Sequence, residues 1–424
     1  MNNFSPSLDF AKQLDSQDPL ASYREGFVIT DPDIIYLDGN SLGRMPKVAQ
    51  ERAKQVIENE WGTDLIRGWN KGWWDAPKRV GDKIGKLIGA AEGQTLVSDT
   101  ISLNLFKLAT SALTLQSDRK RIITDTFNFP SDLYILQGIQ NNLGNHHEII
   151  RICATDDDIT PNIEQLESSI NEDTALVTLS HVVFKSGYLY DLRRISDLAH
   201  RAGALVLWDL SHSVGSVPIH LDDCNADLAI GCTYKYLNGG PGSPGFLYVN
   251  NNIQEKLTSP IWGWWGQKNP FDFSLDYEPA TGAQRFLVGT QPMISLLTME
   301  AALEPTLKAG MDAIRAKSIL MTDYASFLTD TWLAPMGFSL GSPQNSTFRG
   351  SHISIRHKEG YRINRALIEE MNVIPDFRAP DNIRLGFSSL YTSFIEIREG
   401  VDRIKRVIEE KRHEKYPKQK LTVT

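Results

Sequence analysis

Between residues 95 and 249, short apolar runs alternate with stretches of helical periodicity, and this alternation constrains the fold most. Helices are predicted between most of the runs, for example at Ser102–Ala112 and Asp132–Asn141. A strand that returns through a helix to a neighbouring strand builds a parallel sheet with helices on both faces. We therefore predict an α/β fold with a mostly parallel central sheet. The predicted strands are Thr95–Val97, Arg121–Thr124, Ala175–Ser180, Ala204–Trp208, Leu228–Ile230 and Phe246–Val249.

The sequence changes character after about Thr290. Long amphipathic helices are predicted there, with Leu320, Tyr324 and Leu328 on one face. A smaller α+β unit follows, with the predicted elements strand Ser351–Arg356, helix Gly360–Met371, strand Val373–Phe377, strand Ile383–Phe387 and helix Ser393–Glu410. We predict three parts: an N-terminal segment (1–60) that packs with the small domain, a large domain (61–295) and a small C-terminal α+β domain (296–424).

Composition limits the class of protein. The chain has 424 residues, 41% of them hydrophobic, enough for two domains with sizeable cores. Its formal net charge of −8 argues against nonspecific binding to nucleic acid. The three cysteines, Cys153, Cys224 and Cys232, form no Cys-x-x-Cys pair, which favours a reducing compartment. With no signal-peptide pattern and no apolar span of membrane length, we expect a cytoplasmic protein that binds no membrane.

Lys235 follows the apolar run Leu228–Ile230 and precedes a glycine-rich loop, residues 239–242 (Gly-Gly-Pro-Gly). A lysine at a strand end usually extends its amine toward water. A buried lysine, however, loses its proton easily, and the neutral amine attacks aldehydes. The pattern is therefore typical of the Schiff-base lysine in an enzyme that uses pyridoxal phosphate (PLP).

Asp209 comes directly after the run Ala204–Trp208, which we interpret as a buried parallel strand. It thus lies at the carboxyl end of a strand, where open α/β sheets bind ligands. A carboxylate there can keep the pyridine nitrogen of PLP protonated, which makes the ring an electron sink. A helix cap or turn is the alternative for Asp209 alone. The ordered pair of Asp209 and Lys235 favours a PLP site.

Two further features suit this cofactor. Residues 98–102 (Ser-Asp-Thr-Ile-Ser) precede a predicted helix, whose first amides are candidates to bind the phosphate. Plain N-capping uses the same residue types and is the alternative. Phe129, which follows a predicted strand, is a candidate to cover the ring; otherwise it is a core residue at a loop.

Other motifs point to different chemistries. Residues 240–245 (Gly-Pro-Gly-Ser-Pro-Gly) match the dinucleotide motif but lead into a strand, so we reject a nicotinamide enzyme. Residues 39–43 (Gly-Asn-Ser-Leu-Gly) match a nucleophile elbow, which leaves a serine hydrolase using Ser41 as an alternative, although Pro46 delays the helix. Residues 146–148 (His-His-Glu) lack further ligands, so we read an exposed loop and predict no metal.

Four motifs together resemble the kynureninase family, homodimeric PLP enzymes of fold type I. They are residues 36–43 (Tyr-Leu-Asp-Gly-Asn-Ser-Leu-Gly), 128–132 (Asn-Phe-Pro-Ser-Asp), 208–213 (Trp-Asp-Leu-Ser-His-Ser) and 231–238 (Gly-Cys-Thr-Tyr-Lys-Tyr-Leu-Asn). The resemblance extends from about Tyr36 to Tyr391, in order. It accounts for residues 39–43 as a family signature rather than a nucleophile elbow.

The resemblance implies roles for individual residues. Lys235 would carry PLP as a Schiff base and act as general base, Asp209 would pair with the pyridinium, and Tyr234 is the candidate proton relay. Trp264 and Thr290 would contact the cofactor from the partner subunit, which implies an obligate homodimer. The other implied cofactor contacts are Ile101, Ser102, Phe129 (stacked on the ring), Asp132, Ser180 and His212.

The substrate contacts follow from the same resemblance. Arg384 matches the arginine that grips the α-carboxylate of the substrate, a task suited to a planar bidentate fork. Without the resemblance, it would be read as a surface arginine on a strand. Asn40 is a further implied contact. Trp69, Gly289 and Thr290 resemble the bacterial type, which prefers kynurenine to 3-hydroxykynurenine.

The implied reaction is hydrolysis of L-kynurenine to anthranilate and L-alanine, in tryptophan degradation by the kynurenine pathway and in NAD biosynthesis. Gln267 departs from the family, which usually has histidine at that secondary contact. The nearest alternative is another fold type I enzyme, an aminotransferase or a desulfurase. A desulfurase needs a mobile reactive cysteine, and the three cysteines lie in or beside apolar runs. No helix-turn-helix or basic stripe supports a DNA-binding regulator.

Overall fold

The computed structural model describes residues 4–155 and 157–419. In this part of the chain, the main sheet has the strand order β2-β8-β7-β6-β5-β3-β4. Strands β3 to β7 run parallel, whereas β8 is antiparallel to both β7 and β2, so the predicted mostly parallel sheet is confirmed. The bounds are β2 Thr95–Val97, β3 Arg121–Asp125, β4 Glu148–Ile152, β5 Thr174–Ser180, β6 Leu205–Asp209, β7 Leu228–Gly231 and β8 Phe246–Val249.

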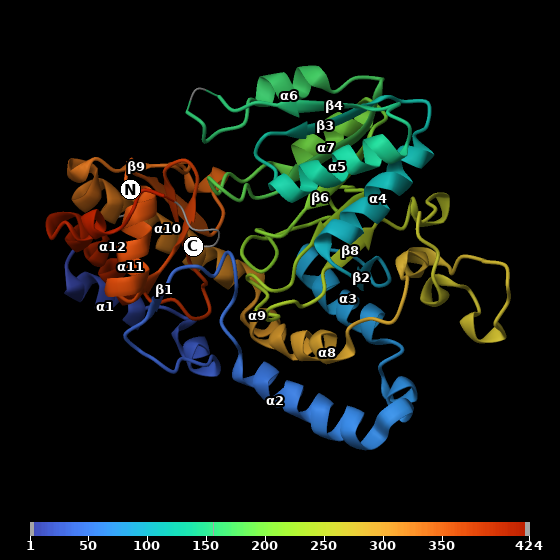
Figure 1. Ribbon diagram of the computed structural model, residues 1–424, viewed down its shortest axis with the longest axis horizontal. Coiled ribbons are helices and arrows are strands. Elements are labelled where there is room, and N and C mark those ends of the chain that lie inside the picture. Colours follow the sequence, from blue (N-terminus) through green and yellow to red (C-terminus); the bar gives the residue numbers. More distant parts are fainter. Residues whose placement is uncertain (1–3, 156, 420–424) are drawn as a thin grey trace.

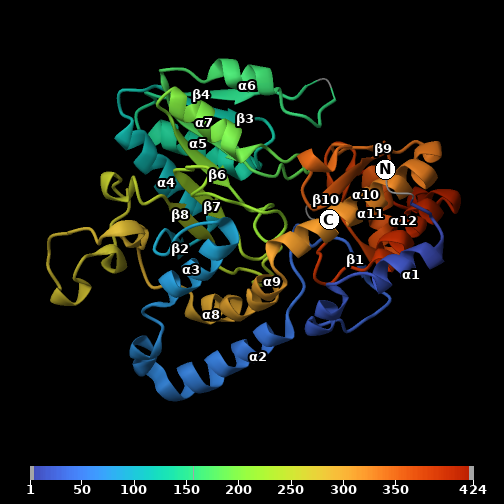
Figure 2. The ribbon, with the colours of Figure 1, turned by 180° about the vertical axis from the view of Figure 1, so that it is seen from behind.

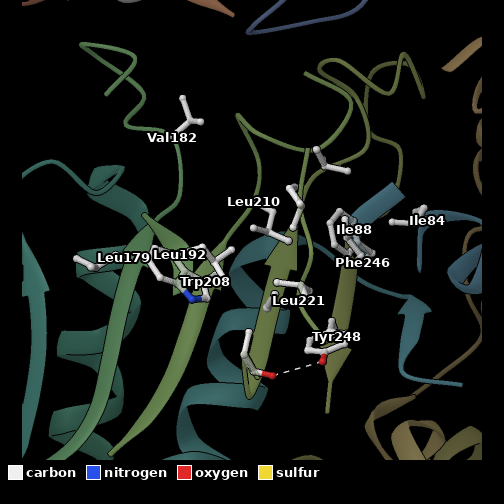
Figure 3. Packing of buried hydrophobic residues seen from close by; sticks show 14 of the residues in the cluster. Ile84, Ile88, Leu179, Val182, Leu192, Trp208, Leu210, Leu221, Phe246 and Tyr248 are labelled. Atoms are coloured by element: carbon white, nitrogen blue, oxygen red, sulfur yellow. Dashed lines mark hydrogen bonds between the residues drawn. The ribbon is translucent and has the colours of Figure 1, made fainter. Parts of the chain in front are cut away.

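Both faces of the main sheet are apolar. In β6, Leu205 and Leu207 belong to one buried cluster, and the alternate residues Val206 and Trp208 belong to another. Because successive strand side chains point to opposite faces, a strand with helices on both sides is buried along its whole length. Figure 3 shows part of the cluster around Trp208 and Phe246.

The helices supply the other half of these two clusters. The Leu205 face is covered by α4 (Ile101–Leu115) and α5 (Pro130–Asn142). The Trp208 face is covered by α3 (Ala76–Ile88), α6 (Ile163–Ser169), α7 (Leu192–Arg201) and α8 (Met293–Ala302). Helix α2 (Lys47–Gln55) packs against α8 at the outer edge of this lobe, as both ribbon views show (Figures 1 and 2).

A smaller lobe lies beside the main sheet (Figure 1). It contains a sheet of order β12-β13-β10-β9 and a parallel pair, β1 with β11. The strand bounds are β1 Ile35–Tyr36, β9 Ser339–Leu340, β10 His352–Arg356, β11 Val373–Ile374, β12 Asp376–Arg378 and β13 Asn382–Gly386. The remaining helices are α1 (Leu8–Ser16), α9 (Glu304–Ala309), α10 (Met311–Leu328), α11 (Gly360–Glu370) and α12 (Phe394–Glu409). The pairing of β1 with β11 joins the N-terminal segment to this lobe.

The structure corrects several predicted elements. The single strand predicted at Val373–Phe377 is two strands, since β11 pairs with β1 and β12 pairs with β13. Pro375 separates them, because it has no N–H to give to a sheet. The strands Glu148–Ile152 and Ser339–Leu340 were missed; both lie at the edge of a sheet and are only partly buried. No helix in the described residues is long and apolar enough to cross a membrane.

Candidate active site

The carboxyl ends of β3, β5, β6 and β7 meet at one edge of the main sheet because these strands are parallel. Ser180 and Asp209 are register partners at that edge. A cavity of about 310 Å³ lies there. The predicted residues that line it are Asn40, Ile101, Ser102, Phe129, Asp132, Asp209, His212, Tyr234, Lys235 and Arg384. Residues without a predicted role at this site also line it: Ser41, Ser131, Phe184, Ser211 and Arg378.

Lys235 is half-buried on a tight turn after β7. Its Nζ atom lies 3.2 Å from Nε2 and 3.3 Å from Nδ1 of His212. The N–H of Asn238 donates to the Lys235 carbonyl (3.0 Å), and the N–H of Gly43 donates to the Tyr234 carbonyl (2.8 Å). A Cβ atom at Gly43 would come within 2.3 Å of the Lys235 carbonyl oxygen. The second glycine of the supposed nucleophile elbow is therefore required for close packing on the lysine turn.

Tyr234 lines the cavity beside Lys235. The neighbouring Cys232 and burial raise the pKa of the Tyr234 phenol above its ordinary value. Burial also raises the pKa of the Cys232 thiol. Both groups therefore keep their protons near neutral pH. Tyr234 can donate a hydrogen bond, and Cys232 is not a reactive thiolate.

Asp209 is held at the end of β6 by two donors. Its Oδ1 accepts from the N–H of Ser211 (2.8 Å) and its Oδ2 accepts from the hydroxyl of Ser180 (3.4 Å). Ser180 thus lies behind Asp209 rather than on the cavity wall. Burial, and next the charge of Asp209, raise the pKa of Asp132 well above its ordinary value. Asp132 therefore keeps its proton and can donate it in a hydrogen bond to Asp209.

His212 forms the wall next to Lys235. Burial, and then the charges of Lys235 and Arg384, lower the pKa of His212 well below its ordinary value. The ring of His352 lies 5.7 Å away, and burial together with Arg384 lowers its pKa to about 3. Both imidazoles are therefore neutral at physiological pH. Neither imidazole therefore adds a positive charge to this wall.

The N-terminus of α4 opens onto the same cavity through Ile101 and Ser102. Thr100 is the N-cap, and its hydroxyl accepts from the N–H of Leu103 (3.3 Å). The hydroxyl of Ser102 is hydrogen-bonded to that of Ser131 (3.1 Å). The first turn of a helix leaves N–H groups without intrahelical partners, so this end of the cavity suits an anion.

The loop before α4 rests on a buried ion pair that sequence reasoning missed. Nζ of Lys107 lies 2.7 Å from Oδ2 of Asp99, 2.7 Å from the Phe286 carbonyl and 3.2 Å from the Ser98 hydroxyl. Asp99 has a φ of 50°, in the left-handed region. Its N–H donates to the side chain of Gln291 (3.0 Å). Lys107 is the one charged residue of α4, so its charge is the signal that could have identified it.

Arg384 is buried, which rules out the alternative of a surface arginine. Its Nε donates to Oδ1 of Asp376 (2.7 Å), its Nη2 donates to Oδ2, and its Nη1 donates to the Phe184 carbonyl (2.6 Å). Burial alone would raise the pKa of Asp376, but Arg384 and Arg378 outweigh that effect and lower it. Sequence reasoning missed Asp376 and Arg378, because their position beside Arg384 depends on the register of β12 and β13.

Five predicted residues are not in the lining of this cavity: Trp69, Ser180, Trp264, Gly289 and Thr290. The ring of Trp69 packs edge-on against Trp264, with 6.1 Å between centroids. Thr290 is exposed and Gly289 is half-buried. Trp264 and Thr290 are the residues that the resemblance assigned to a partner subunit.

Neither the supposed nucleophile elbow (residues 39–43) nor the run His-His-Glu (residues 146–148) forms the catalytic or metal site that its pattern suggested. The Ser41 hydroxyl donates to Asp376 (3.1 Å) and accepts from Arg384 (3.0 Å), and no histidine of the described residues is hydrogen-bonded to it. His147 is buried, which corrects its assignment to an exposed loop, and Glu148 begins β4. Across residues 4–155 and 157–419, no group of three His, Cys, Asp or Glu side chains could hold a metal ion.

Comparisons with solved structures concern the fold. The chain superposes on a cysteine desulfurase from Thermococcus onnurineus NA1 with a TM-score of 0.78, at 17% identity, covering 94% of this chain and 98% of that one. A cysteine desulfurase from Escherichia coli gives a TM-score of 0.77 at 17% identity, over 96% and 100% of the two chains. These likenesses confirm the predicted fold type I class.

Comparisons of sequence are more specific. Residues 314–404 match the family model described as the kynureninase C-terminal domain. The chain is 42% identical over 403 residues to a kynureninase of Pseudomonas fluorescens, covering 94% of each. It is 42% identical over 404 residues to a kynureninase of Burkholderia pseudomallei (strain 1106a), covering 94% of this chain and 95% of the relative. The identity is too high and too extended to reflect a shared fold alone. This chain therefore belongs to the kynureninase family.

Proposed function

We propose that this protein is a PLP-dependent kynureninase, which hydrolyses L-kynurenine to anthranilate and L-alanine. One observation carries the proposal: a chain 42% identical to kynureninases over 94% of its length brings Lys235, Asp209 and Arg384 into one cavity. A covalent anchor, a partner for a ring nitrogen and a carboxylate receptor are the groups that this reaction requires.

The donor set of the cavity fits PLP. PLP has three groups that a protein can bind. Its aldehyde reacts with an amine, its pyridine nitrogen pairs with a carboxylate, and its phosphate accepts hydrogen bonds from N–H groups. Lys235 supplies the amine, Asp209 the carboxylate, and the first turn of α4 at Ile101 and Ser102 the N–H groups. Phe129 also lines the cavity, which supports its proposed role of covering the ring. A volume of about 310 Å³ lies in the range of small-ligand sites.

Four polar side chains of the cavity would have distinct tasks in the reaction. When bound, the cofactor supplies an electron sink for the α-carbon of an amino acid. Asp209 would hold a proton at the pyridine nitrogen, and Asp132, which also lines the cavity, can donate a hydrogen bond to Asp209. The amine of Lys235, beside the neutral His212, removes the proton from the α-carbon as general base. Tyr234, which keeps its own proton, donates protons in the later steps.

The substrate lies between the arginine and the aromatic residues. Arg384 and Asn40 bind its α-carboxylate. Phe129 and Phe184, whose rings meet edge-on at 5.3 Å, border the same space. Trp69 and Gly289 adjust the fit of the aryl ring and favour kynurenine over 3-hydroxykynurenine. A comparison of kcat/KM for the two substrates tests this preference, and a higher value for the hydroxylated one contradicts it.

The protein acts as a homodimer in which Trp264 and Thr290 complete the site of the partner. The support is an apolar groove of about 630 Å³ between α2 and α8, lined among others by Met45, Ala53 and Ile294. Other large apolar side chains are exposed nearby in sequence: Trp61, Ile66, Phe271 and Phe273. An exposed apolar groove, with large apolar side chains exposed elsewhere on the surface, is typical of a chain that associates with another subunit.

We place the enzyme in the cytoplasm, in tryptophan catabolism through kynurenine and in NAD biosynthesis. The support for the compartment is that all three cysteines are free thiols, two of them buried. Family membership supports the pathway.

The decisive experiment is to mix the purified, PLP-loaded protein with L-kynurenine and to follow the fluorescence of anthranilate. Anthranilate and alanine should form in equal amounts. A Lys235→Ala variant is the control, since it keeps the cavity but lacks the amine. Release of sulfide from L-cysteine, without cleavage of kynurenine, would instead identify a desulfurase.

A further inference from the structure

The guanidinium group of Arg384 is nearly saturated by the protein itself. A guanidinium carries five N–H donors. Nε and Nη2 both donate to Asp376, Nη2 also donates to Ser41 (3.0 Å), and Nη1 donates to the Phe184 carbonyl (2.6 Å). One N–H, on Nη1, is left for a ligand. A bidentate grip on a carboxylate needs two parallel N–H groups, so Arg384 cannot provide it alone without releasing a partner.

A second arginine stands at the same end of the cavity. In the antiparallel pair of β12 and β13, Asp376 faces Arg384, and Arg378 lies two residues beyond Asp376 on the same face of β12. Nη2 of Arg378 lies 2.7 Å from Oδ2 of Asp376, so one carboxylate holds both guanidinium groups. The side chain of Arg378 is 33% exposed and lines the cavity.

Arg378 also keeps unused donors. Its Nε is buried and has no acceptor among the described residues. Its Nη1 makes a long contact of 3.3 Å with the Phe377 carbonyl. A second orphaned donor lies close by in the lining, since the buried amide of Asn40 has neither Nδ2 nor Oδ1 paired within the described chain. Buried donors without acceptors are costly unless a ligand satisfies them.

The charges of this corner favour an anion. Two arginines face one fully charged carboxylate, Asp376. Asp38, the other acid of the cluster, is largely buried, and burial followed by the charge of Asp376 raises its pKa to about 7. At any pH below this pKa, more than half of the Asp38 side chains are therefore protonated and neutral. The corner carries a net positive charge, and a second carboxylate is the group that balances it.

We propose that Arg378 and Arg384 together bind the α-carboxylate of the substrate, with Asp376 as the positioning residue that holds the two guanidinium groups side by side. This inference rests on the proposed function for the identity of the substrate. The competing explanation is that Arg378 only neutralises Asp376 and never contacts a ligand.

The test compares the same substitution at two arginines, one in the lining of the cavity and one outside it. Arg378→Gln removes the second cation. The matched control is Arg356→Gln, because Arg356 is similarly exposed (27%), pairs with one acid, Asp381, and lies outside the lining of the cavity. The substrate carboxylate takes no part in the reaction, so its contact with Arg378 should be equally strong in the bound substrate and in the transition state. Loss of such a contact raises KM and leaves kcat unchanged. Arg378→Gln should therefore raise the KM for kynurenine about tenfold or more at similar kcat. Arg356→Gln should leave both unchanged.

A binding measurement removes the dependence on turnover. L-alanine and ethylamine differ by the carboxylate, and each is titrated calorimetrically into the PLP-loaded protein. The wild type should prefer alanine, Arg378→Gln should lose about tenfold in alanine affinity and none for ethylamine, and Arg378→Lys should recover part of the loss. The inference is wrong if Arg378→Gln loses affinity equally for both ligands, or if its affinity for alanine is unchanged. It is also wrong if the wild type binds alanine no more tightly than ethylamine. Failure of the wild type to cleave kynurenine refutes the proposed function instead, and leaves this comparison valid.

Discussion

Nζ of Lys235 lies 3.2 Å from Nε2 of His212, an imidazole whose pKa burial and the lysine itself hold well below the ordinary value. A neutral ring beside the amine removes the electrostatic repulsion that a histidinium would create. The pair therefore places neither a second positive charge nor a second titrating group beside the amine in the physiological range.

Replacement of Lys235 by alanine should abolish turnover and the covalent attachment of the cofactor. The amine that lines the cavity is the group able to bond the aldehyde. Borohydride reduction followed by mass spectrometry should find the cofactor fixed to the wild-type chain and absent from the variant. Ordinary activity in Lys235→Ala would contradict the assignment.

Asp209→Asn should lose several orders of magnitude in kcat while it still binds PLP. The amide is nearly isosteric, so the contact from the Ser211 N–H (2.8 Å) can persist, but it no longer favours a protonated pyridine nitrogen. The measurement is kcat together with the equilibrium binding of the cofactor. A small loss in rate would mean that another group tunes the ring.

Lys107→Met should destabilise the fold by about 3 kcal/mol, because it leaves the Asp99 carboxylate without its buried cation. Lys78→Met is the control: that lysine also contacts an acid, Asp82, at 2.6 Å, but it is 57% exposed. Exposed pairs contribute about 1 kcal/mol or less, so the control should unfold like the wild type. Denaturant unfolding of both variants gives the comparison, and equal losses would show that the buried pair has no special weight.

Stability should depend on pH through Asp38, whose pKa rises from 3.8 to about 7 on folding. A raised pKa means that the folded state binds the proton more tightly, so this stabilisation is complete below pH 3.8 and is lost as pH rises through 7. The melting temperature of Asp38→Asn, which cannot ionise, should therefore increase relative to that of the wild type between pH 4 and 8. A constant difference across this range would show that Asp38 does not titrate there.

Sites shared between subunits should show complementation. Lys235→Ala and Trp264→Ala are each expected to be severely impaired, but random mixing of subunits should restore about a quarter of the wild-type activity, because heterodimers contain one intact site. The control mixes Lys235→Ala with Asp209→Asn. These two residues line one cavity of the same chain, so no intact site forms and no activity should return.

The sequence was informative where the relevant signal is local. Asp209 and Lys235 follow apolar runs, and the carboxyl ends of parallel strands share an edge, so their meeting could be predicted from pattern alone. The bounds of β2 and β8 were predicted correctly for the same reason.

Other contacts depend on long-range geometry. Asp376 meets Arg384 through the register of two strands, and Pro375 divides a run that looked continuous. Asp99 has a left-handed backbone conformation, and Lys107 lies in a helix that is otherwise uncharged. Neither feature alone predicts that the two side chains form an ion pair. The hydrophobic periodicity of the sequence could not predict these contacts, because they arise from tertiary packing.

Asn40 and Arg384 line the same cavity although nearly the whole chain separates them in sequence. A ribosome must therefore synthesise β13 before the receptor for the substrate exists. Nascent chains that end before this strand contain the main sheet and Lys235, yet they lack the arginine that selects an amino acid. The last group needed for substrate recognition is thus synthesised after the residues of the same chain that would hold the cofactor.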